Sequence, residues 1–195
     1  MVSVWYLVLT GAVAVDRLAE MAYSRRNQKK LGERGARKVH DPVFGGMVAL
    51  HVGYLCAAPL EVTLFHRPFL PWLGWPALFV LAAANALRVW AIRALSIHWN
   101  MQIVASQSLG AVSSGPYRWI RHPNYAAVFL EVAALPLVHT AWVTALIASA
   151  AHAVLLARRI SAEEKVWMSE PAYRRQMGSK PRFVPGAGRK RSAIS

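Results

Sequence analysis

The apolar residues of this chain are gathered in long blocks, and most of the charged residues lie between the blocks. Hydropathy marks blocks at about 2–23, 42–65 and 72–95, and a longer run at 125–157. Because a helix rises about 1.5 Å per residue, each of the first three blocks can cross a bilayer core about 30 Å thick. The last run is too long for one crossing and carries Pro136, His139 and Thr140 near its middle. We therefore predict an all-α integral membrane bundle of five transmembrane helices, the last two forming a tight helical hairpin.

The distribution of charge predicts how these helices are oriented. Lys and Arg number 23 against 9 Asp and Glu, a net charge of +14. Basic residues cluster at 25–38, at 118–121 and after residue 157, whereas the link between the second and third blocks has only Arg67. By the positive-inside rule, the basic loops and the C-terminus face the cytoplasm and the N-terminus lies outside. We expect a protein of the bacterial inner (cytoplasmic) membrane.

Composition also narrows the possible partners. The basic residues flank apolar blocks, where topology and anionic lipid head groups account for them, so membrane lipids are expected partners and nucleic acid is not. The single cysteine, Cys56, excludes a disulfide within one chain. The sequence has no metal-spaced His pair, no glycine-rich phosphate loop and no GxGxxG motif, and we expect no metal site. It makes no prediction of oligomeric state.

The densest polar segment, at 114–125, precedes the last apolar run. Gly115-Pro116 is a turn signal, and Pro123 suits the first turn of the following helix. Arg121 and His122 then stand at the start of that helix, a favourable place for an anion. The alternative is that the arginines only bind lipid phosphates while the aromatic residues form an interfacial belt.

A second polar pair ends the last apolar run. Arg159 and Glu163 are four residues apart, which places them on one helical face where they can meet or share a ligand. A simple surface ion pair is the alternative. Because a helical hairpin returns the chain to the side from which it started, we expect this pair and segment 114–125 to converge at one cytoplasmic interface.

Together these motifs resemble the isoprenylcysteine carboxyl methyltransferase family of membrane enzymes. The resemblance rests on Gly115-Pro116-Tyr117-x-x-x-Arg121-His122-Pro123-x-Tyr125, an apolar hairpin, Arg159-x-x-x-Glu163 and then Tyr173-Arg174-Arg175. It implies S-adenosylmethionine as the methyl donor, with Arg159 and Arg121 as catalytic residues and Arg159 facing the acceptor. It also implies a cofactor site formed by Gln102, Leu109, Gly110, Ala111, Val112, Tyr117, His122, Pro123, Asn124, Tyr125 and Glu163.

The longer stretch from Arg121 to Leu137 is similar to a bacterial branch of this family that methylates the ring hydroxyl of long-chain alkylresorcinols and alkylpyrones. The resemblance implies a lipophilic small-molecule substrate. Glu131 lies about two turns inside the predicted fourth helix, where a carboxylate facing lipid would be costly. We expect it to face the bundle, either as a structural hydrogen-bond partner or as a group that binds the acceptor.

Other functions stay open at this point. A prenylcysteine carboxyl methyltransferase, a phospholipid N-methyltransferase and a non-enzymatic membrane module are alternatives. An NADPH-dependent sterol-type reductase shares the Arg-His-Pro-Asn-Tyr string but commonly follows it with Gly-Glu, where this chain has Ala126-Ala127. The expected organisation is a transmembrane scaffold of three helices at 1–97, a catalytic unit at 98–185 and a disordered basic tail at 186–195.

Overall fold

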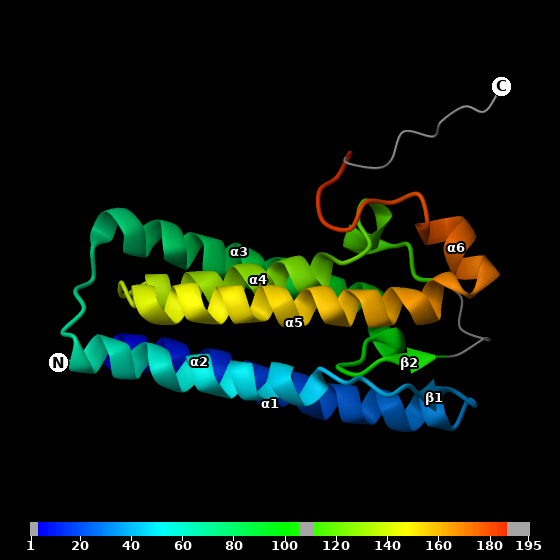
Figure 1. Cartoon of the computed structure of the whole chain (residues 1–195), viewed down its shortest axis with the longest axis horizontal. Helices are drawn as coiled ribbons and strands as arrows, with labels where there is room; N and C mark the ends of the chain where they lie inside the picture. Colours follow the sequence, from blue (N-terminus) through cyan, green and yellow to red (C-terminus); the bar gives the residue numbers. More distant parts are fainter. Residues whose placement is uncertain (1–3, 106–110, 187–195) are drawn as a thin grey trace.

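The computed structural model describes residues 4–105 and 111–186, and within them the chain is almost entirely helical (Figure 1). The predicted all-α class is confirmed. Two short strands, β1 (Arg37–Lys38) and β2 (Val104–Ala105), pair antiparallel. The helices are α1 (Val4–Gly32), α2 (Phe44–Leu64), α3 (Pro71–Leu95), α4 (Pro123–Leu137), α5 (Trp142–Met168) and α6 (Pro171–Met177), with 3₁₀ turns η1 (Ser96–His98) and η2 (Gly115–Arg118).

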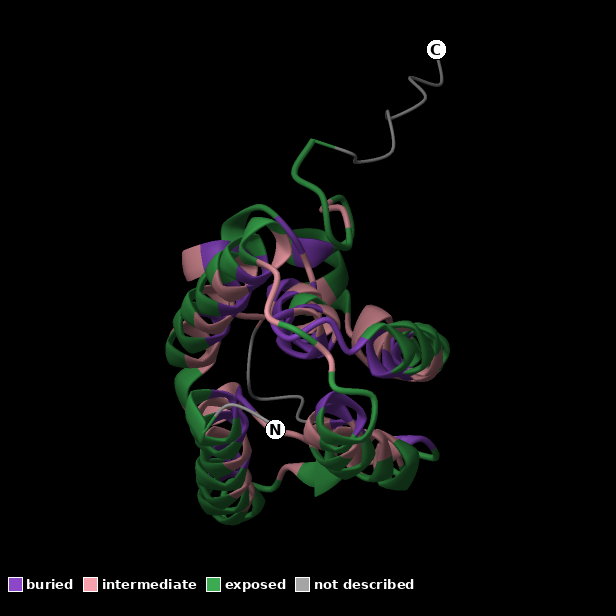
Figure 2. Ribbon diagram, turned by 90° about the vertical axis from the view of Figure 1, so that its left-hand side faces the viewer, coloured by how far each residue is buried: buried purple, intermediate pink, exposed green. Residues whose placement is uncertain are grey.

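The described residues contain three helical stretches long and apolar enough to span a membrane: α2, Pro71–His98 and α5. α4 is apolar but has only 15 residues, which at about 1.5 Å each fall short of a bilayer core. Large apolar side chains such as Trp72, Phe79 and Leu146 are exposed. Figure 2 shows that exposed residues, in green, lie on the outward faces of the helices. The protein is therefore an integral membrane protein, while five crossings stay a prediction.

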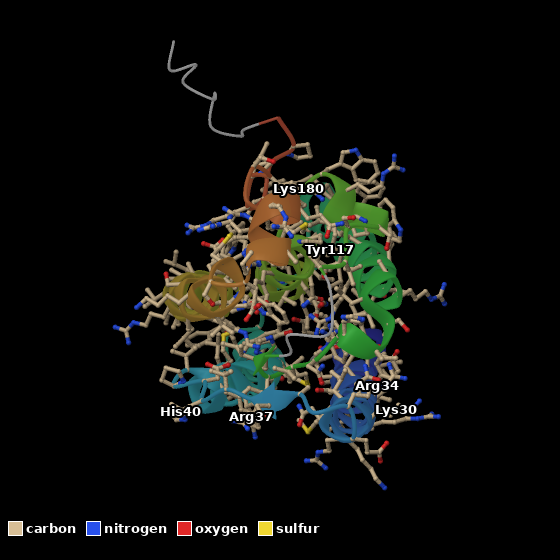
Figure 3. All side chains as sticks on the ribbon, turned by 90° about the vertical axis from the view of Figure 1, so that its right-hand side faces the viewer. Lys30, Arg34, Arg37, His40, Tyr117 and Lys180 are labelled. Carbon is tan, nitrogen blue, oxygen red and sulfur yellow. The ribbon has the colours of Figure 1, made fainter. Side chains whose placement is uncertain are left out.

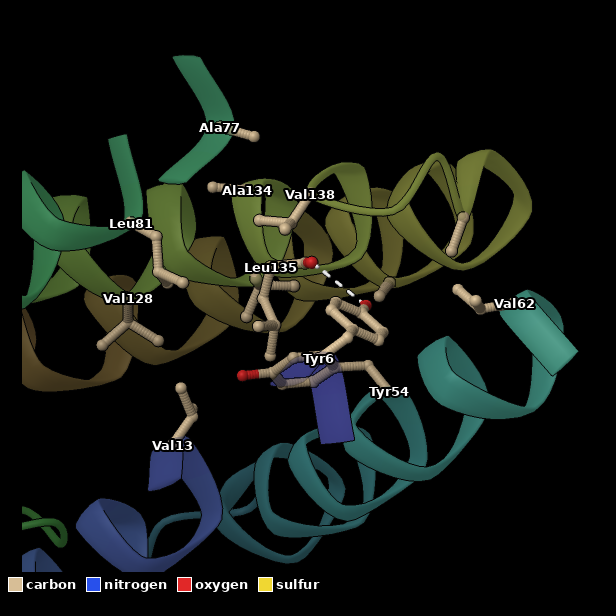
Figure 4. Close-up of a cluster of buried hydrophobic side chains, with 13 residues drawn as sticks. Tyr6, Val13, Tyr54, Val62, Ala77, Leu81, Val128, Ala134, Leu135 and Val138 are labelled. Carbon is tan, nitrogen blue, oxygen red and sulfur yellow. Dashed lines mark hydrogen bonds between the residues drawn. The ribbon is translucent and has the colours of Figure 1, made fainter. Parts of the chain in front are cut away.

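Helix α4 lies between α3 and α5 and carries much of the apolar core (Figures 1 and 4). Its residues Val128, Val132 and Leu135 are buried against side chains of α1 and α2. The Tyr6 hydroxyl donates a hydrogen bond of 3.1 Å to the Leu135 carbonyl, the dashed line in Figure 4. Because this bond satisfies a buried hydroxyl, it fixes the N-terminal end of α1 against α4.

The chain turns between α4 and α5 over residues 138–141, beside Pro136. Thr140 adopts a φ of 55° and its hydroxyl donates to the Pro68 carbonyl at 2.8 Å. A ring nitrogen of His139 lies 3.0 Å from the Arg67 carbonyl. The link between α2 and α3 and the turn between α4 and α5, which both lack basic clusters, therefore pack together at the same end of the bundle.

Arg17 and Glu20, two of the charges that interrupt the first apolar block, are buried between helices. The Arg88 guanidinium of α3 makes two hydrogen bonds to the Glu20 carboxylate of α1, and Arg17 lies 3.0 Å from the same carboxylate. Arg17 and Arg88 also approach Glu131 of α4, at 3.5 and 3.7 Å. Buried charges of opposite sign stabilise one another in this way, whereas each alone would be costly in a bilayer. α1 therefore faces the bundle with ion pairs as well as apolar side chains.

Candidate active site

A pocket lies at the end of the bundle that carries the basic loops, opposite the 138–141 turn (Figures 1 and 3). Residues of α1, α3, η1, β2, η2, α4, α5 and α6 contribute to it, together with the segments that flank η1 and η2. Its wall includes the aromatic rings of Trp99, Tyr117, Tyr125, Trp167 and Tyr173. Polar side chains lie among these rings: His98, Asn100, Arg121, His122, Asn124 and Glu163.

The segment before α4 is shaped by a tight turn against α3. Gly115 has a φ of 57°, a left-handed conformation that glycine adopts without steric cost. A Cβ at this position would lie only 2.7 Å from the Ala94 side chain, so η2 approaches α3 more closely than any other residue would allow. The turn buries Tyr117, and Pro123 then begins α4 as the sequence predicted. Tyr117 and His122 are thereby brought to the same pocket.

Arg159 and Glu163 of α5 are joined through a tyrosine rather than to each other directly. The Tyr125 hydroxyl donates to Glu163 and accepts from Nε of Arg159 at 2.8 Å. The terminal nitrogens of Arg159 donate to the Asp41 carboxylate and, at 2.5 Å, to the Met101 carbonyl. The guanidinium is thus held from three sides, and segments 41, 101, 125 and 159–163 meet at one point.

The neighbouring residue on α5, Glu164, forms a second polar cluster. Its carboxylate accepts hydrogen bonds from Nε2 of His122 at 3.1 Å and from Arg182 at 2.6 Å, and lies 3.4 Å from Arg121. The hydrogen bond from Arg182 to this carboxylate raises the pKa of that guanidinium. The cluster ties the C-terminal segment to the start of α4.

Backbone hydrogen bonds also hold the C-terminal segment against the segment before α4. The N–H groups of Arg121 and His122 donate to the carbonyls of Pro181 and Arg182 at 2.9 and 3.0 Å. The amino group of Lys180, labelled beside Tyr117 in Figure 3, donates to the Tyr117 carbonyl at 2.7 Å. Residues 180–182 therefore run alongside the segment before α4.

The phenols of Tyr117 and Tyr173 stay neutral in this environment. Burial raises the pKa of each hydroxyl above its ordinary value, and the nearby negative charge of Glu163 raises it further. A raised phenol pKa favours the protonated form at every physiological pH. These two residues can therefore offer an aromatic face and a hydroxyl donor, but not a phenolate base.

The structure brings most of the predicted site residues to one pocket. Ala111, Val112, Tyr117, Arg121, His122, Asn124, Tyr125 and Glu163 line it. Arg159 contacts the wall through Tyr125, and Pro123 is buried at the start of α4. Gln102 and Glu131 are not among the lining residues, and Glu131 lies with Arg17 and Arg88 inside the bundle. Leu109 and Gly110 lie outside the described residues, as do positions 187–195 of the tail.

Sequence reasoning missed several residues of the site. Asp41 lies between β1 and α2, 118 positions from the arginine it holds. Glu164 is adjacent to Glu163, but no role was assigned to it from the sequence. Tyr173 was part of the resemblance but had no assigned role, although an aromatic residue after a Glu-Pro helix start was a usable signal.

Comparison with known proteins adds to this geometry. The family model described as the isoprenylcysteine carboxyl methyltransferase (ICMT) family matches residues 77–169. The chain is 35% identical over 161 residues to the uncharacterized protein YpbQ of Bacillus subtilis (strain 168), covering 82% of this chain and 95% of that protein.

The chain belongs to the isoprenylcysteine carboxyl methyltransferase family. The resemblance seen in the sequence motifs is thus confirmed, and family membership makes the protein a membrane methyltransferase. The matched stretch runs from α3 to the end of α5, so it contains the Tyr125, Arg159 and Glu163 contacts. Asp41, Tyr173 and Arg182 lie outside that stretch.

Proposed function

We propose that this membrane methyltransferase moves a methyl group from S-adenosylmethionine to a hydroxyl oxygen of a lipophilic acceptor. The observation that carries the proposal is the chain of contacts from Glu163 through Tyr125 to Arg159. One end of this chain is an anion that lines the pocket, and the other is a cation behind the pocket wall. A cationic donor and an oxygen acceptor need groups of these two signs, held at a fixed spacing.

The residues of the pocket fit S-adenosylmethionine. The Glu163 carboxylate suits the positively charged amino and sulfonium groups, and the rings of Tyr117, Trp167 and Tyr173 suit adenine or a cation. The side-chain oxygens of Asn100 and Asn124 are buried and, within the part of the chain that the structure describes, have no hydrogen-bond partner. Buried polar atoms of this kind are costly unless a ligand or water satisfies them.

When bound, S-adenosylmethionine supplies an electrophilic methyl group on a sulfonium. Transfer breaks the S–CH₃ bond and forms an O–CH₃ bond, with S-adenosylhomocysteine as the leaving group and the hydroxyl proton released to water. Arg159 has five N–H groups, and three are donated to Tyr125, Asp41 and Met101. Once the hydroxyl has lost its proton, the remaining two would stabilise the acceptor oxyanion, which is the nucleophile, and hold it in line with the methyl group.

We place the reaction at the cytoplasmic surface of the inner membrane. The pocket lies at the same end of the bundle as Lys30, Arg34 and Arg37, which Figure 3 labels on the side away from Tyr117. The positive-inside rule assigns that end to the cytoplasm. An acceptor of the alkylresorcinol or alkylpyrone type suits this location, because its alkyl tail would stay in the lipid while its ring hydroxyl reaches the interface.

Two substitutions on α5 test the proposed roles. We expect Arg159→Ala to lower turnover by about 100-fold while leaving the dissociation constant for S-adenosylmethionine within about threefold. We expect Glu163→Ala to weaken cofactor binding by about tenfold or more. Arg158→Ala is the matched control, because Arg158 is an exposed arginine beside Arg159 on the same helix. Turnover and equilibrium binding are measured on purified protein in detergent, and the reverse pattern would overturn both assignments.

A further inference from the structure

Asp41 contacts the catalytic arginine from a part of the chain outside the family match. It lies in the link between β1 and α2, and its side chain is only 3% exposed, against 6% for Arg159. One carboxylate oxygen accepts from Nη1 of Arg159, and the other accepts from the backbone N–H of Val43 at 3.1 Å. Both oxygens are therefore occupied by protein donors.

The backbone around Asp41 is also fixed. Its carbonyl accepts the Phe44 N–H at 3.3 Å, and the Val39 N–H donates to the Ile103 carbonyl at 2.9 Å. The bond between Val39 and Ile103 extends the pairing of β1 with β2 toward Met101. The Met101 carbonyl accepts a hydrogen bond from the other terminal nitrogen of Arg159. The carboxylate is thus presented to the guanidinium by a braced loop, and it occupies this place in the folded protein before any acceptor arrives.

This contact changes what Arg159 can bind. A free guanidinium is a preferred partner for a carboxylate, because two parallel N–H groups match its two oxygens. Here one terminal nitrogen already holds the Asp41 carboxylate, and the other holds a carbonyl. The Asp41 carboxylate also offsets the single positive charge of Arg159. Each terminal nitrogen keeps one N–H, so a carboxylate acceptor need not displace Asp41, but it would enter beside the negative charge of Asp41, whereas a hydroxyl acceptor enters uncharged and needs only one remaining N–H.

We infer that Asp41 is a specificity-determining residue, which positions and neutralises Arg159 so that the site selects an uncharged hydroxyl acceptor over a carboxylate. The inference rests on the proposed methyl transfer and names the acceptor class of that same site. It assigns a role in the site to the link before α2, which the sequence had placed in the transmembrane scaffold. Asp41 acts through Arg159 and does not itself contact the acceptor.

The decisive variant is Asp41→Asn, which keeps an oxygen for the Val43 N–H but removes the charge beside Arg159. The probes are a long-chain alkylresorcinol and palmitate, each supplied in detergent with methyl-labelled S-adenosylmethionine. Label in the resorcinol ether survives mild base, whereas label in the palmitate ester is released as methanol. We expect the ratio of palmitate to resorcinol methylation to rise by about tenfold or more in Asp41→Asn. Glu33→Gln is the matched control, since it removes an exposed negative charge near the same basic loop.

A binding measurement separates this inference from the proposed function. Palmitate binding, followed by tryptophan fluorescence without any methyl donor, should be about tenfold tighter in Asp41→Asn than in the parent protein and unchanged in Glu33→Gln. If the parent protein methylates neither probe, the binding ratio still tests Asp41. An unchanged binding ratio, or a parent protein that methylates palmitate as fast as the resorcinol, would overturn the inference. Retained S-adenosylmethionine binding by Asp41→Asn shows that the variant is folded.

Discussion

Replacing Tyr125 with phenylalanine removes one oxygen atom that hydrogen-bonds to both Arg159 and Glu163. The hydroxyl accepts from Arg159 at 2.8 Å and donates to Glu163, while the ring stacks on His122 with centroids 5.3 Å apart. Phenylalanine keeps the ring contact and loses both hydrogen bonds. A hydrogen bond to a charged group contributes about 1.5–3 kcal/mol. Arg159 keeps its contacts with Asp41 and Met101, so we expect a loss of about 2 kcal/mol of transition-state stabilisation, or roughly 30-fold in kcat/KM.

The assay for Tyr125→Phe is methyl transfer at saturating and limiting acceptor, together with equilibrium binding of S-adenosylmethionine. We expect most of the loss in kcat, with the cofactor dissociation constant within about threefold of the parent value. Tyr23→Phe is the control, because Tyr23 packs on Trp99 from α1 and has no contact with Arg159 or Glu163 in the described residues. Parent-like turnover would show that the hydroxyl does not organise Arg159. Loss of cofactor binding would show that the hydroxyl contacts the donor instead.

Three further predictions concern the framework of the site. Gly115→Ala should destabilise the protein by at least about 1 kcal/mol, because alanine tolerates neither the positive φ nor the 2.7 Å approach to α3. A melting temperature equal to that of the parent protein in detergent would refute this prediction. Glu20→Leu should lower the free energy of unfolding by about 3–5 kcal/mol, because it leaves Arg88 without its main partner, and adding Arg88→Met should restore most of this loss. Equal unfolding midpoints for the single and double variants would contradict the buried pair. Glu164→Gln should expose the bond after Arg182 to trypsin about tenfold faster, read by mass spectrometry, and an unchanged rate would mean that Glu164 does not anchor the C-terminal segment.

The sequence was sufficient for the apolar part of the fold. Blocks long enough to span a bilayer became α2, α3 and α5, because hydropathy and length decide this directly. The first block was harder, since Arg17 and Glu20 meet partners on α3 and α4 that are distant in sequence. Periodicity within one helix predicts which face is buried, but it does not identify the helix that supplies the opposite charge.

The residues of the site also divide into those that the sequence predicted and those that it did not. Arg159 and Glu163 could be paired from their spacing on one helix, and Tyr117, His122 and Tyr125 from a single short motif. Asp41 could not, because its contact depends on how the link before α2 folds across the end of α5. The insertion of Tyr125 between Arg159 and Glu163 was also unforeseen, since the same spacing permits a direct ion pair.

The most direct test of the central claim is the fate of labelled methyl groups. Membranes containing the protein are incubated with methyl-labelled S-adenosylmethionine and host lipid extract, and the lipids are then extracted and treated with mild base, with Arg159→Ala membranes as the control. We expect label in a base-stable lipid that is absent from the control. Label released as methanol would move the acceptor to a carboxylate, and consumption of NADPH without any label would contradict methyl transfer altogether.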